Sequence, residues 1–298
     1  MKFSIVTPSF NSEKYIANTI ESVLSQSGNF EIEYFIIDGD SNDKTVEIIK
    51  DYEDRFKAGR FEKKCNEIKF NWISEKDSGM YDAIDKGFAM ANGDIYAWIN
   101  ADDFYADGTF EKVHDIFTTF TDIKWVKGIS NFIDEENNLI RENPCYTHRQ
   151  DWIKKGVYGR NAYHITQDSV FWISELWKKT GSISPTLKYA GDYELWIKMS
   201  NSEKLWSVNS VFSFFRKRQG QLSKDVTSYR KEQQKIYPQT IFSNFSIRLF
   251  FNLESRLRVF QSFFLSLYKY YFINSQESFI NETPLGFQKK TTSSYIVK

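Results

Sequence analysis

The first hundred residues alternate short apolar runs with segments of helical periodicity, and this alternation most constrains the fold. Apolar strands are predicted at residues 2–6, 32–37, 69–73 and 95–99. Between them, apolar residues recur at helical spacing in three segments that begin near Ser12, Asp43 and Met80. Strand–helix–strand repeats of this length form βαβ units, because parallel strands need a crossover connection. We therefore expect an α/β fold with a mostly parallel sheet flanked by helices.

Polar side chains follow each of these predicted strands. Thr7 and Asn11 follow the first strand, Asp38 the second, Asp77 the third, and the sequence "NADD" the fourth. In open parallel sheets, the carboxyl ends of the strands line one edge, and ligands bind just outside it. The sequence therefore predicts that these side chains contribute to one binding site.

The "NADD" stretch, residues 100–103, supplies oxygen ligands of the kind that Mg²⁺ and Mn²⁺ prefer. It could also cap a helix, because "ADDFYADGTFEKV" leads into one, and spacing alone favours the cap. The sequence contains no GxxxxGK[ST] loop, and no GxGxxG follows the first strand. The phosphates of a bound nucleotide would therefore have to be held by a metal ion, and "NADD" is the candidate site for that ion.

The stretch "AGDYELW" places Asp192 and Glu194 at the start of a predicted helix. A carboxylate there could act as a general base on a hydroxyl group. The alternative is that Asp192 caps the helix and Glu194 adds a favourable charge in its first turn. The three histidines show no metal-binding spacing, and the absence of a GxSxG motif argues against an acyl-transfer hydrolase.

The charge balance and the cysteine count narrow the class of protein. Lys+Arg and Asp+Glu both number 39, so the net charge is zero, which argues against general nucleic-acid binding. The two cysteines, Cys65 and Cys145, are too few for a disulfide framework and suit a reducing, cytoplasmic compartment. The N-terminus resembles a first strand rather than a secretory signal, and no charge-free apolar segment approaches membrane-spanning length.

The second half is less periodic. A hairpin is predicted over 125–140 with its turn at "DEENN", and further strands at 169–173 and 205–215. Strand signals stop near residue 223, and the polar tail from about residue 281 is expected to be mobile. Residues 247–272 form a basic, aromatic amphipathic segment. It could lie on the inner face of a membrane, pack on the rest of the chain, or form a homodimer contact, and amphipathicity alone leaves these open.

Four segments taken in order resemble the inverting glycosyltransferases of family 2, which have the GT-A fold. They are "SIVTPSFNSEKYIANTIESVLSQS", "FIIDGDSNDKT", "SEKDSGMYDAIDKGFAMANGDIYAWINADD" and "YAGDYELWIKM". Most positions of residues 3–104 match the family pattern, and fewer positions match from there to residue 223. The resemblance is nearest to the bacterial subgroup that builds O-antigen, capsule and exopolysaccharide. It implies a GT-A domain at 1–223, with a nucleotide-sugar half (1–104) and an acceptor half (105–223). A helical extension at 224–298 would follow.

The resemblance also implies a donor site. Asp38 matches the acid that holds the base, usually uracil, and Gly39 stands where the family usually has a second acid. Asn100 replaces the first acid of the family's metal motif, and Asp102 matches the acid that coordinates Mn²⁺ or Mg²⁺. Arg218 lies in a late loop where relatives often carry histidine. The full set of implied donor-site residues is Thr7, Pro8, Asn11, Asp38, Asp77, Gly79, Lys86, Asn100, Ala101, Asp102 and Arg218.

On the acceptor side, Asp192 matches the family's catalytic base, and Gly191 stands where many members carry an acid. Gln167, Glu194 and Trp196 are expected to face the acceptor. The implied mechanism is a single displacement, in which Asp192 takes a proton from the attacking hydroxyl group and the anomeric configuration inverts.

We therefore expect a metal-dependent transferase that moves one sugar from a nucleotide-diphosphate donor, a UDP-sugar, to a saccharide hydroxyl group. The resemblance implies a lipid-linked acceptor, bacterial surface polysaccharide biosynthesis, and a cytoplasmic protein at the inner face of the plasma membrane. The alternative is a non-catalytic nucleotide-sugar or glycan-binding relative. Asn100 and Gly191 favour that alternative, and the three acids Asp38, Asp102 and Asp192 oppose it.

Overall fold

The computed structural model describes residues 1–160, 162–238, 277–292 and 294–297, together with Phe245, Ile247 and Leu249. The described elements, in chain order, are β1 (Lys2–Ser9), α1 (Ile16–Leu24), β2 (Gly28–Asp38), α2 (Thr45–Lys57), β3 (Cys65–Ser74), α3 (Met80–Met90), β4 (Ile95–Trp98), β5 (Phe104–Tyr105), α4 (Thr109–Thr119), β6 (Trp125–Ile133), β7 (Leu139–Arg141), α5 (Gln150–Lys154), η1 (Gln167–Ser169), β8 (Val170–Ile173), α6 (Ser174–Thr180), α7 (Gly191–Ser202), β9 (Trp206–Arg216), η2 (Leu222–Lys224), α8 (Val226–Ile236), β10 (Glu277–Thr283) and β11 (Gly286–Thr292).

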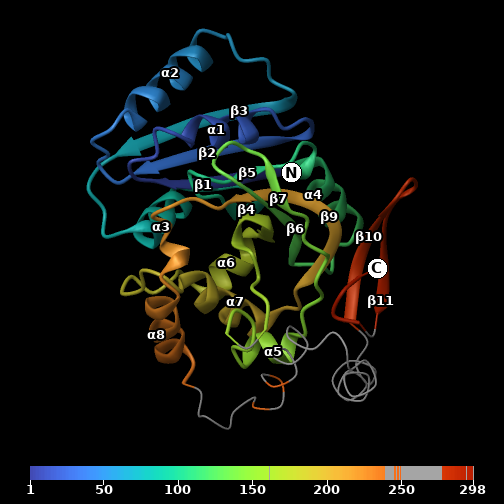
Figure 1. Ribbon diagram of the computed structural model, residues 1–298. Helices are drawn as coiled ribbons and strands as arrows, with labels where there is room; N and C mark the ends of the chain where they lie inside the picture. The colour runs from blue at the N-terminus through green and yellow to red at the C-terminus, as the bar shows by residue number, and fades with distance from the viewer. Residues whose placement is uncertain are drawn as a thin grey trace.

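One sheet organises the molecule, with strands in the order β11-β10-β9-β6-β8-β4-β1-β2-β3 (Figure 1). In the N-terminal half, β1 pairs in parallel with β2 and β4, and β2 pairs in parallel with β3. The predicted α/β fold with a mostly parallel sheet is therefore confirmed. The register aligns Ser9 with Asp38 and Asp38 with Ser74, so three strand ends reach the same edge.

The strands next to β1 are apolar on both faces, because helices cover both sides of the sheet. On one face, Phe3 and Ile5 of β1 join a core that includes Ile20 of α1, Ile49 of α2 and Phe110 of α4. On the other face, Val6 joins a core formed with α3, α5, α6 and α7. Successive residues of a strand point to opposite faces, so β1 contributes to both cores.

In the second half of the sheet, β8 alone among β4, β8, β6, β9 and β10 runs in the opposite direction, because it is antiparallel to both β4 and β6, whereas β6, β9 and β10 are parallel to one another. The predicted hairpin is confirmed as β6 and β7, which pair antiparallel. Trp98 of β4 stacks on Trp196 of α7 with ring centroids 5.7 Å apart. Trp125 and Trp172 also pack against Trp196. This buried aromatic cluster fixes α7 beneath the sheet.

The C-terminal residues correct an expectation from the sequence. Residues 277–292 form the hairpin β10–β11, and β10 pairs in parallel with β9 (the red hairpin in Figure 1). The predictions that strands end near residue 223 and that the polar tail is mobile are therefore wrong for this segment. Ile280 is fully buried, and Phe279 is 7% exposed. The sequence pattern of this hairpin did not indicate strands, because β11 is the edge strand and carries mostly exposed polar side chains.

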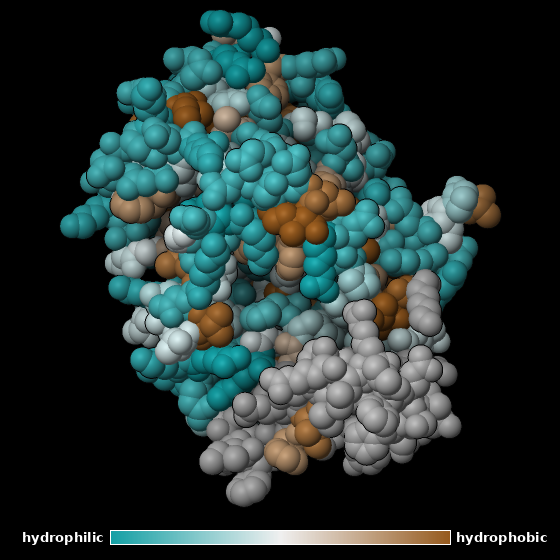
Figure 2. Space-filling view, viewed as in Figure 1, coloured by the Kyte–Doolittle hydropathy of each residue, from teal (hydrophilic) through white to brown (hydrophobic). Residues whose placement is uncertain are grey.

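The amphipathic segment predicted at 247–272 lies outside the described residues, apart from Ile247 and Leu249. Among the helices that the structure describes, none combines the length and apolarity needed to cross a membrane. Figure 2 shows a face on which hydrophobic residues are scattered among hydrophilic ones. Scattered apolar residues of this kind are normal on a protein surface.

Candidate active site

Asp38 lies at the carboxyl end of β2 and is fully buried. One carboxylate oxygen accepts hydrogen bonds from the Ser41 backbone N–H at 3.0 Å and from Ser74 Oγ at 2.7 Å. The other oxygen accepts from Ser41 Oγ at 2.5 Å. Beside it, Thr7 on β1 shares a hydrogen bond of 2.9 Å with the hydroxyl group of Tyr34. Hydrogen bonds to both oxygens hold the Asp38 carboxylate in one orientation.

The loops after β1 and β2 are linked through Asn11, which follows the buried Pro8 on β1. The Asn11 side-chain oxygen accepts from the Asn42 N–H at 3.0 Å, and the Asn11 N–H donates to Ser41 Oγ at 2.8 Å. Asn11 has a φ of 47°, a left-handed conformation that asparagine tolerates better than most residues. Phe10, next to it, lies just after the carboxyl end of β1 and is 61% exposed.

Gly39, where the family usually has a second acid, faces the carboxylate of Asp77. A Cβ atom at position 39 would lie 2.8 Å from Asp77 Oδ2. Asp77 is itself held, because its Oδ1 accepts from the Gly79 N–H at 2.8 Å. A second acid at position 39 would therefore place its carboxylate on that of Asp77. The glycine at position 39, where the family usually has an acid, therefore leaves room for the Asp77 side chain at this edge of the sheet.

Lys86 lies on α3, where its ammonium group pairs with Glu75 at 2.9 Å and with Asp82 at 3.6 Å. Its hydrogen bond with Glu75 raises the pKa of Lys86, so the side chain stays charged. Its role as a phosphate ligand stays a prediction, and binding a phosphate there would require Lys86 to share or exchange these two partners.

The "NADD" stretch links β4 to the short strand β5. The helix that follows, α4, begins at Thr109 with Gly108 at its N-cap, so the capping interpretation of Asp102 and Asp103 does not hold. Asp103 is fully buried, and its Oδ1 accepts from the Arg216 backbone N–H at 2.9 Å. Burial raises the pKa of Asp103 well above its usual value, and the nearby negative charges of Asp102 and Asp168 add to the rise. The buried Asp103 side chain therefore holds this turn against the end of β9 through its hydrogen bond with the Arg216 N–H.

Asp102 points to the late loop and meets Arg218. Arg218 Nε lies 2.6 Å from Asp102 Oδ2, and Gln221 Nε2 donates to the same oxygen at 3.3 Å. The backbone carbonyl of Asp102 accepts from Nε of the buried Arg216 at 2.9 Å. Arg216 also donates to the carbonyl of Asp134 in the β6–β7 turn at 2.9 Å. Arg216, the last residue of β9, and Arg218, in the loop that follows, therefore hold the predicted metal-binding residue by its backbone and its side chain.

Asn100, Ala101 and Asp102 can be tested as a metal site from their own chemistry. Among the described residues, Asn100 Oδ1 is buried without a hydrogen-bond partner. That oxygen and the Asp102 carboxylate are hard ligands, and Mg²⁺ commonly takes one or two protein ligands with water and substrate phosphates. Within the described part of the chain, no three His, Cys, Asp or Glu side chains form a metal-binding group. The residues therefore fit an ion whose remaining ligands come from a bound diphosphate.

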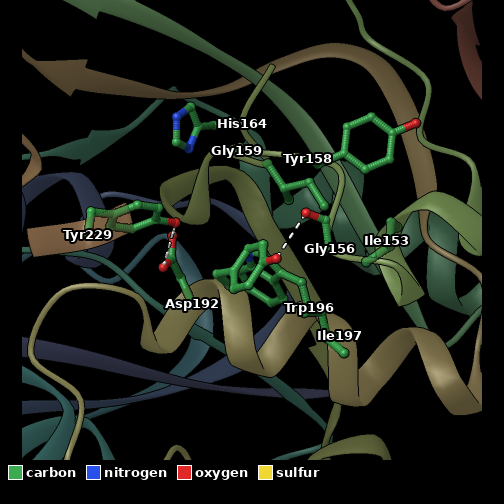
Figure 3. Close-up of a pocket in the computed structure, with 11 residues that line it drawn as sticks. Ile153, Gly156, Tyr158, Gly159, His164, Asp192, Trp196, Ile197 and Tyr229 are labelled. Carbon is green, nitrogen blue, oxygen red and sulfur yellow. Dashed lines mark hydrogen bonds between the residues drawn. The ribbon is translucent and has the colours of Figure 1, made fainter. Parts of the chain in front are cut away.

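Asp192 lies in the first turn of α7. Ala190 is the N-cap residue of this helix, and no side-chain hydrogen bond caps it within the described residues, so Asp192 is not a cap. The hydroxyl group of Tyr229 donates to the two carboxylate oxygens of Asp192, at 3.2 and 3.5 Å (Figure 3). Burial raises the pKa of Asp192 to about 6, although the Tyr229 hydrogen bond opposes the rise. Such a carboxylate is ionised at neutral pH and is a stronger base than an ordinary aspartate.

Gly191, the other departure from the family pattern, is explained by packing. A Cβ atom at this position would lie 2.7 Å from the ring of Tyr81 and 2.5 Å from the side chain of Ile183. Tyr81 follows Gly79 closely in the chain, and its hydroxyl group accepts from the Asp192 N–H at 3.4 Å. Gly191 therefore lets the start of α7 approach α3, which follows the Asp77 loop.

The predicted acceptor-side residues have different surroundings. Trp196 lines a pocket with Asp192, Tyr158, His164 and Tyr229 (Figure 3). Among the described residues, both amide atoms of Gln167 in η1 are buried without a hydrogen-bond partner. Glu194 is engaged within the protein, accepting from the Ser184 N–H at 2.8 Å and pairing with Lys198 at 3.1 Å. The acceptor roles of Gln167, Glu194 and Trp196 stay predictions.

Sequence reasoning missed four residues that organise this region: Arg216, Glu135, Tyr229 and Glu232. Glu135 accepts from Lys14 at 2.6 Å and from the Tyr15 hydroxyl group at 2.8 Å, which links the β6–β7 turn to the start of α1. Arg216 could have been noticed as a charge at the end of an apolar strand. Tyr229 and Glu232, three residues apart on a polar helix, gave no signal of their own.

Residues 4–171 match the family model described as Glycosyl transferase family 2, which covers more than half of the chain. The chain belongs to glycosyltransferase family 2. The membership that the sequence motifs predicted is confirmed, and the protein is a glycosyltransferase.

Two curated relatives differ in how far this family 2 chain matches them. An uncharacterised glycosyltransferase of Methanocaldococcus jannaschii is 25% identical over 295 residues, which cover 97% of this chain and 94% of the relative. Chondroitin synthase of Escherichia coli is 24% identical over 211 residues, or 70% of this chain. The chain matches only 28% of the length of that synthase.

Solved structures of other proteins share the fold. S. aureus TarS 1–349 in complex with UDP-GlcNAc aligns with a TM-score of 0.60 and 17% identity, covering 91% of this chain and 78% of that one. The mannosyltransferase PcManGT of Pyrobaculum calidifontis, in complex with GDP-Man and Mn²⁺, aligns with a TM-score of 0.51 and 13% identity. It covers 90% of this chain and 69% of that one. At these identities the likeness concerns the fold alone.

Proposed function

We propose that this family 2 enzyme transfers a single sugar from a UDP-sugar to a hydroxyl group of a saccharide acceptor, with inversion at the anomeric carbon. The observation that carries the proposal is Asp192, a carboxylate with its pKa raised to about 6 at the start of a helix that contacts α3. The strand ends supply Asp38, Asp77 and Asp102 for a nucleotide diphosphate.

The donor half binds by complementary hydrogen bonding and charge. Asp38 is already held by Ser41 and Ser74, so it can accept a hydrogen bond from the base without losing further freedom. Asp77 and Gly79 form the adjoining loop, where ribose and diphosphate would lie. UDP is the proposed nucleotide because the motif resembles those that hold uracil, and the structurally similar TarS binds UDP-GlcNAc.

The part of the site where the diphosphate would lie can balance its negative charge with Arg218 and with a bound divalent ion. Arg218 is placed to bind phosphate oxygens with its planar guanidinium group. Asp102 and Asn100 would hold a divalent ion, Mn²⁺ or Mg²⁺, which when bound stabilises the negative charge that develops on the departing diphosphate. Arg218 bonds the same Asp102 oxygen at 2.6 Å, so it must share or leave that oxygen when donor and ion bind.

At the acceptor end, Asp192 accepts the proton of the attacking hydroxyl group. The oxygen attacks the anomeric carbon from the face opposite the diphosphate, and the bond to the leaving phosphate oxygen breaks as the new glycosidic bond forms. A single displacement of this kind inverts the configuration. Positioned proton transfer contributes on the order of 10²- to 10⁴-fold to such a reaction.

For the acceptor, we propose a lipid-linked saccharide of a bacterial surface polysaccharide. Chondroitin synthase, a curated relative, is named for making a polysaccharide. A lipid-linked acceptor would also give the basic segment 247–272 a purpose at an anionic membrane surface. Acceptor-binding residues at 105–223 are part of this proposal, and the division near residue 223 does not extend to β10 and β11, which belong to the same sheet.

A thermal-shift screen of nucleotide sugars, each with and without Mn²⁺, tests the proposal. A ligand that binds the native state raises the melting temperature, and the rise grows with the logarithm of the ratio of free ligand to its dissociation constant. We expect UDP-sugars to stabilise the protein more than GDP-sugars or free sugars do. If no nucleotide sugar raises the melting temperature, the proposed function is wrong.

Gly39→Asp, which restores the family's second acid, should weaken donor binding instead of improving it. The new carboxylate would meet that of Asp77, whose Oδ2 lies 2.8 Å from a Cβ atom at position 39. We expect the dissociation constant for UDP, measured by calorimetry, to rise about tenfold. Adding Asp77→Asn to the same variant should recover part of the loss, and tighter binding by Gly39→Asp would contradict this explanation of the glycine.

Arg218→Gln should strengthen Mn²⁺ binding and weaken UDP binding. Removing the guanidinium group frees Asp102 Oδ2 and removes a repulsive positive charge, so we expect about tenfold higher Mn²⁺ affinity without nucleotide. Titration followed by electron paramagnetic resonance measures this directly. Lys217→Gln is the matched control, because its ammonium group lies over the rings of Phe132 and Phe215 at 4.2 and 4.4 Å. Unchanged Mn²⁺ affinity in Arg218→Gln would show that the ion does not use Asp102.

A further inference from the structure

Helix α8 lies outside the residues that match the family model, yet it contacts the segment that carries the proposed base. Glu232 of α8 accepts three backbone hydrogen bonds from consecutive residues just before α7. The donors are Lys188 at 2.9 Å, Tyr189 at 2.8 Å and Ala190 at 2.8 Å. Three N–H groups on one carboxylate leave this stretch of backbone little freedom. Asp192 follows two residues later.

Tyr229 is three residues before Glu232, so both side chains lie on the same face of α8. Its hydroxyl group reaches the carboxylate of Asp192 (Figure 3). Burial and the neighbouring charge of Asp192 raise the pKa of Tyr229 well above its usual value, so the phenol remains a hydrogen-bond donor. The N-terminus of α8 is capped, because the Asp225 side chain accepts a hydrogen bond from the Ser228 N–H at 3.0 Å. Figure 1 shows α7 and α8 next to each other.

We propose that α8 is a clamp for the catalytic base, in which Glu232 fixes the backbone before α7 and Tyr229 positions the carboxylate of Asp192 for proton transfer. This inference rests on the proposed function, because it takes Asp192 as the base. Tyr229 and Glu232 are positioning residues, which act on the reaction through Asp192.

The groups that face Asp192 predict how the clamp affects its proton affinity. Tyr229 and Glu232 face it from α8, Tyr81 from α3, and Tyr193 lies beside it on α7. The hydrogen bond from Tyr229 stabilises the ionised carboxylate and lowers the pKa of Asp192, whereas the negative charge of Glu232 raises it. Changes at the two positions should therefore move the pKa of Asp192 in opposite directions.

Tyr229→Phe is expected to shift the acid limb of the kcat profile upward by about one pH unit, because the carboxylate loses a stabilising hydrogen bond. Activity should therefore fall most below pH 7 and recover in part at higher pH. Tyr193→Phe is the matched control. Its hydroxyl group lines the same pocket but donates to the Gly156 carbonyl at 2.9 Å rather than to Asp192. It should leave the acid limb in place even if the protein becomes less stable.

Glu232→Gln removes the charge and keeps one acceptor oxygen, which can serve the Tyr189 and Ala190 N–H groups, while it gives up the oxygen that accepts from Lys188. The loss of the negative charge should shift the same limb downward. Titration of the Asp192 carboxyl carbon by ¹³C NMR, assigned with Asp192→Asn, reads the pKa without relying on turnover. Opposite shifts in Tyr229→Phe and Glu232→Gln, with unchanged affinity for UDP, support the clamp. A Tyr229→Phe variant whose Asp192 pKa equals that of the wild type overturns it. A wild-type protein that binds no nucleotide sugar would refute the proposed function instead, and the NMR titration would still decide the clamp.

Discussion

Asp192→Asn should abolish sugar transfer while leaving donor binding unchanged. An asparagine amide has almost the same shape as the carboxylate but cannot accept the proton of the attacking hydroxyl group. We expect the rate of nucleotide release at saturating donor to fall about 10²- to 10⁴-fold. The affinity for UDP, measured by calorimetry on the same samples, should change less than twofold, because the base contacts the acceptor rather than the nucleotide.

Glu194→Gln is the control for this experiment. Glu194 lies in the same turn of α7 and loses the same charge, but its carboxylate bonds Ser184 and Lys198 rather than the reacting groups. Because it leaves the proposed base in place, Glu194→Gln should lose far less turnover than Asp192→Asn, even where Glu194 contacts the acceptor as predicted. Full turnover by Asp192→Asn, or an equal loss in both variants, would show that Asp192 is not the base. The pH dependence of the wild type follows from the same group: activity should fall as the pH drops through about 6 and Asp192 takes up a proton.

Asp102→Ala should lower both donor binding and turnover. The substitution removes the carboxylate that holds Arg218 at 2.6 Å and that would hold the ion. Losing one group that stabilises charge in the transition state costs on the order of 10² to 10³ in rate. We also expect Mn²⁺ to lose its effect on UDP affinity, which calorimetry with and without the ion will detect.

Asp107→Asn controls for the loss of a negative charge near the same turn, since Asp107 is exposed and lies between β5 and α4. It should change neither turnover nor the Mn²⁺ effect. A variant Asp102→Ala that keeps a Mn²⁺-dependent gain in UDP affinity would contradict the assignment of Asp102. The two main substitutions thus separate the ends of the site, because one spares donor binding and the other does not.

The N-terminal half of the fold could be predicted from the sequence because local patterns decide it. The runs before Thr7, Asp38 and Asp102 are apolar on both faces, as strands between two layers of helices must be. Their parallel pairing brings the strand ends to one edge, so the gathering of these polar strand-end residues could be predicted before any contact was known.

The remainder depends on contacts between distant residues, which a sequence pattern does not encode. β10 is a strand because β9 offers it an edge, and its own pattern is short. Arg218 meets Asp102 across 116 positions of the chain, and Tyr229 meets Asp192 across 37. In the sequence, Gly39 and Gly191 appear only as missing acids of the family's motifs. The structure shows that a side chain at position 39 would collide with Asp77 and one at position 191 with Tyr81.

The anomeric configuration of the first product tests the account most directly. Proton NMR can follow an α-linked UDP-sugar as a high concentration of enzyme transfers the sugar to methanol or water, before free sugar mutarotates. A single displacement at the anomeric carbon, with Asp192 as the base, predicts that the β-configured product forms first and that Asp192→Asn forms it at least about 10²-fold more slowly. An α-configured first product, or equal cleavage by the variant, would contradict the proposed mechanism.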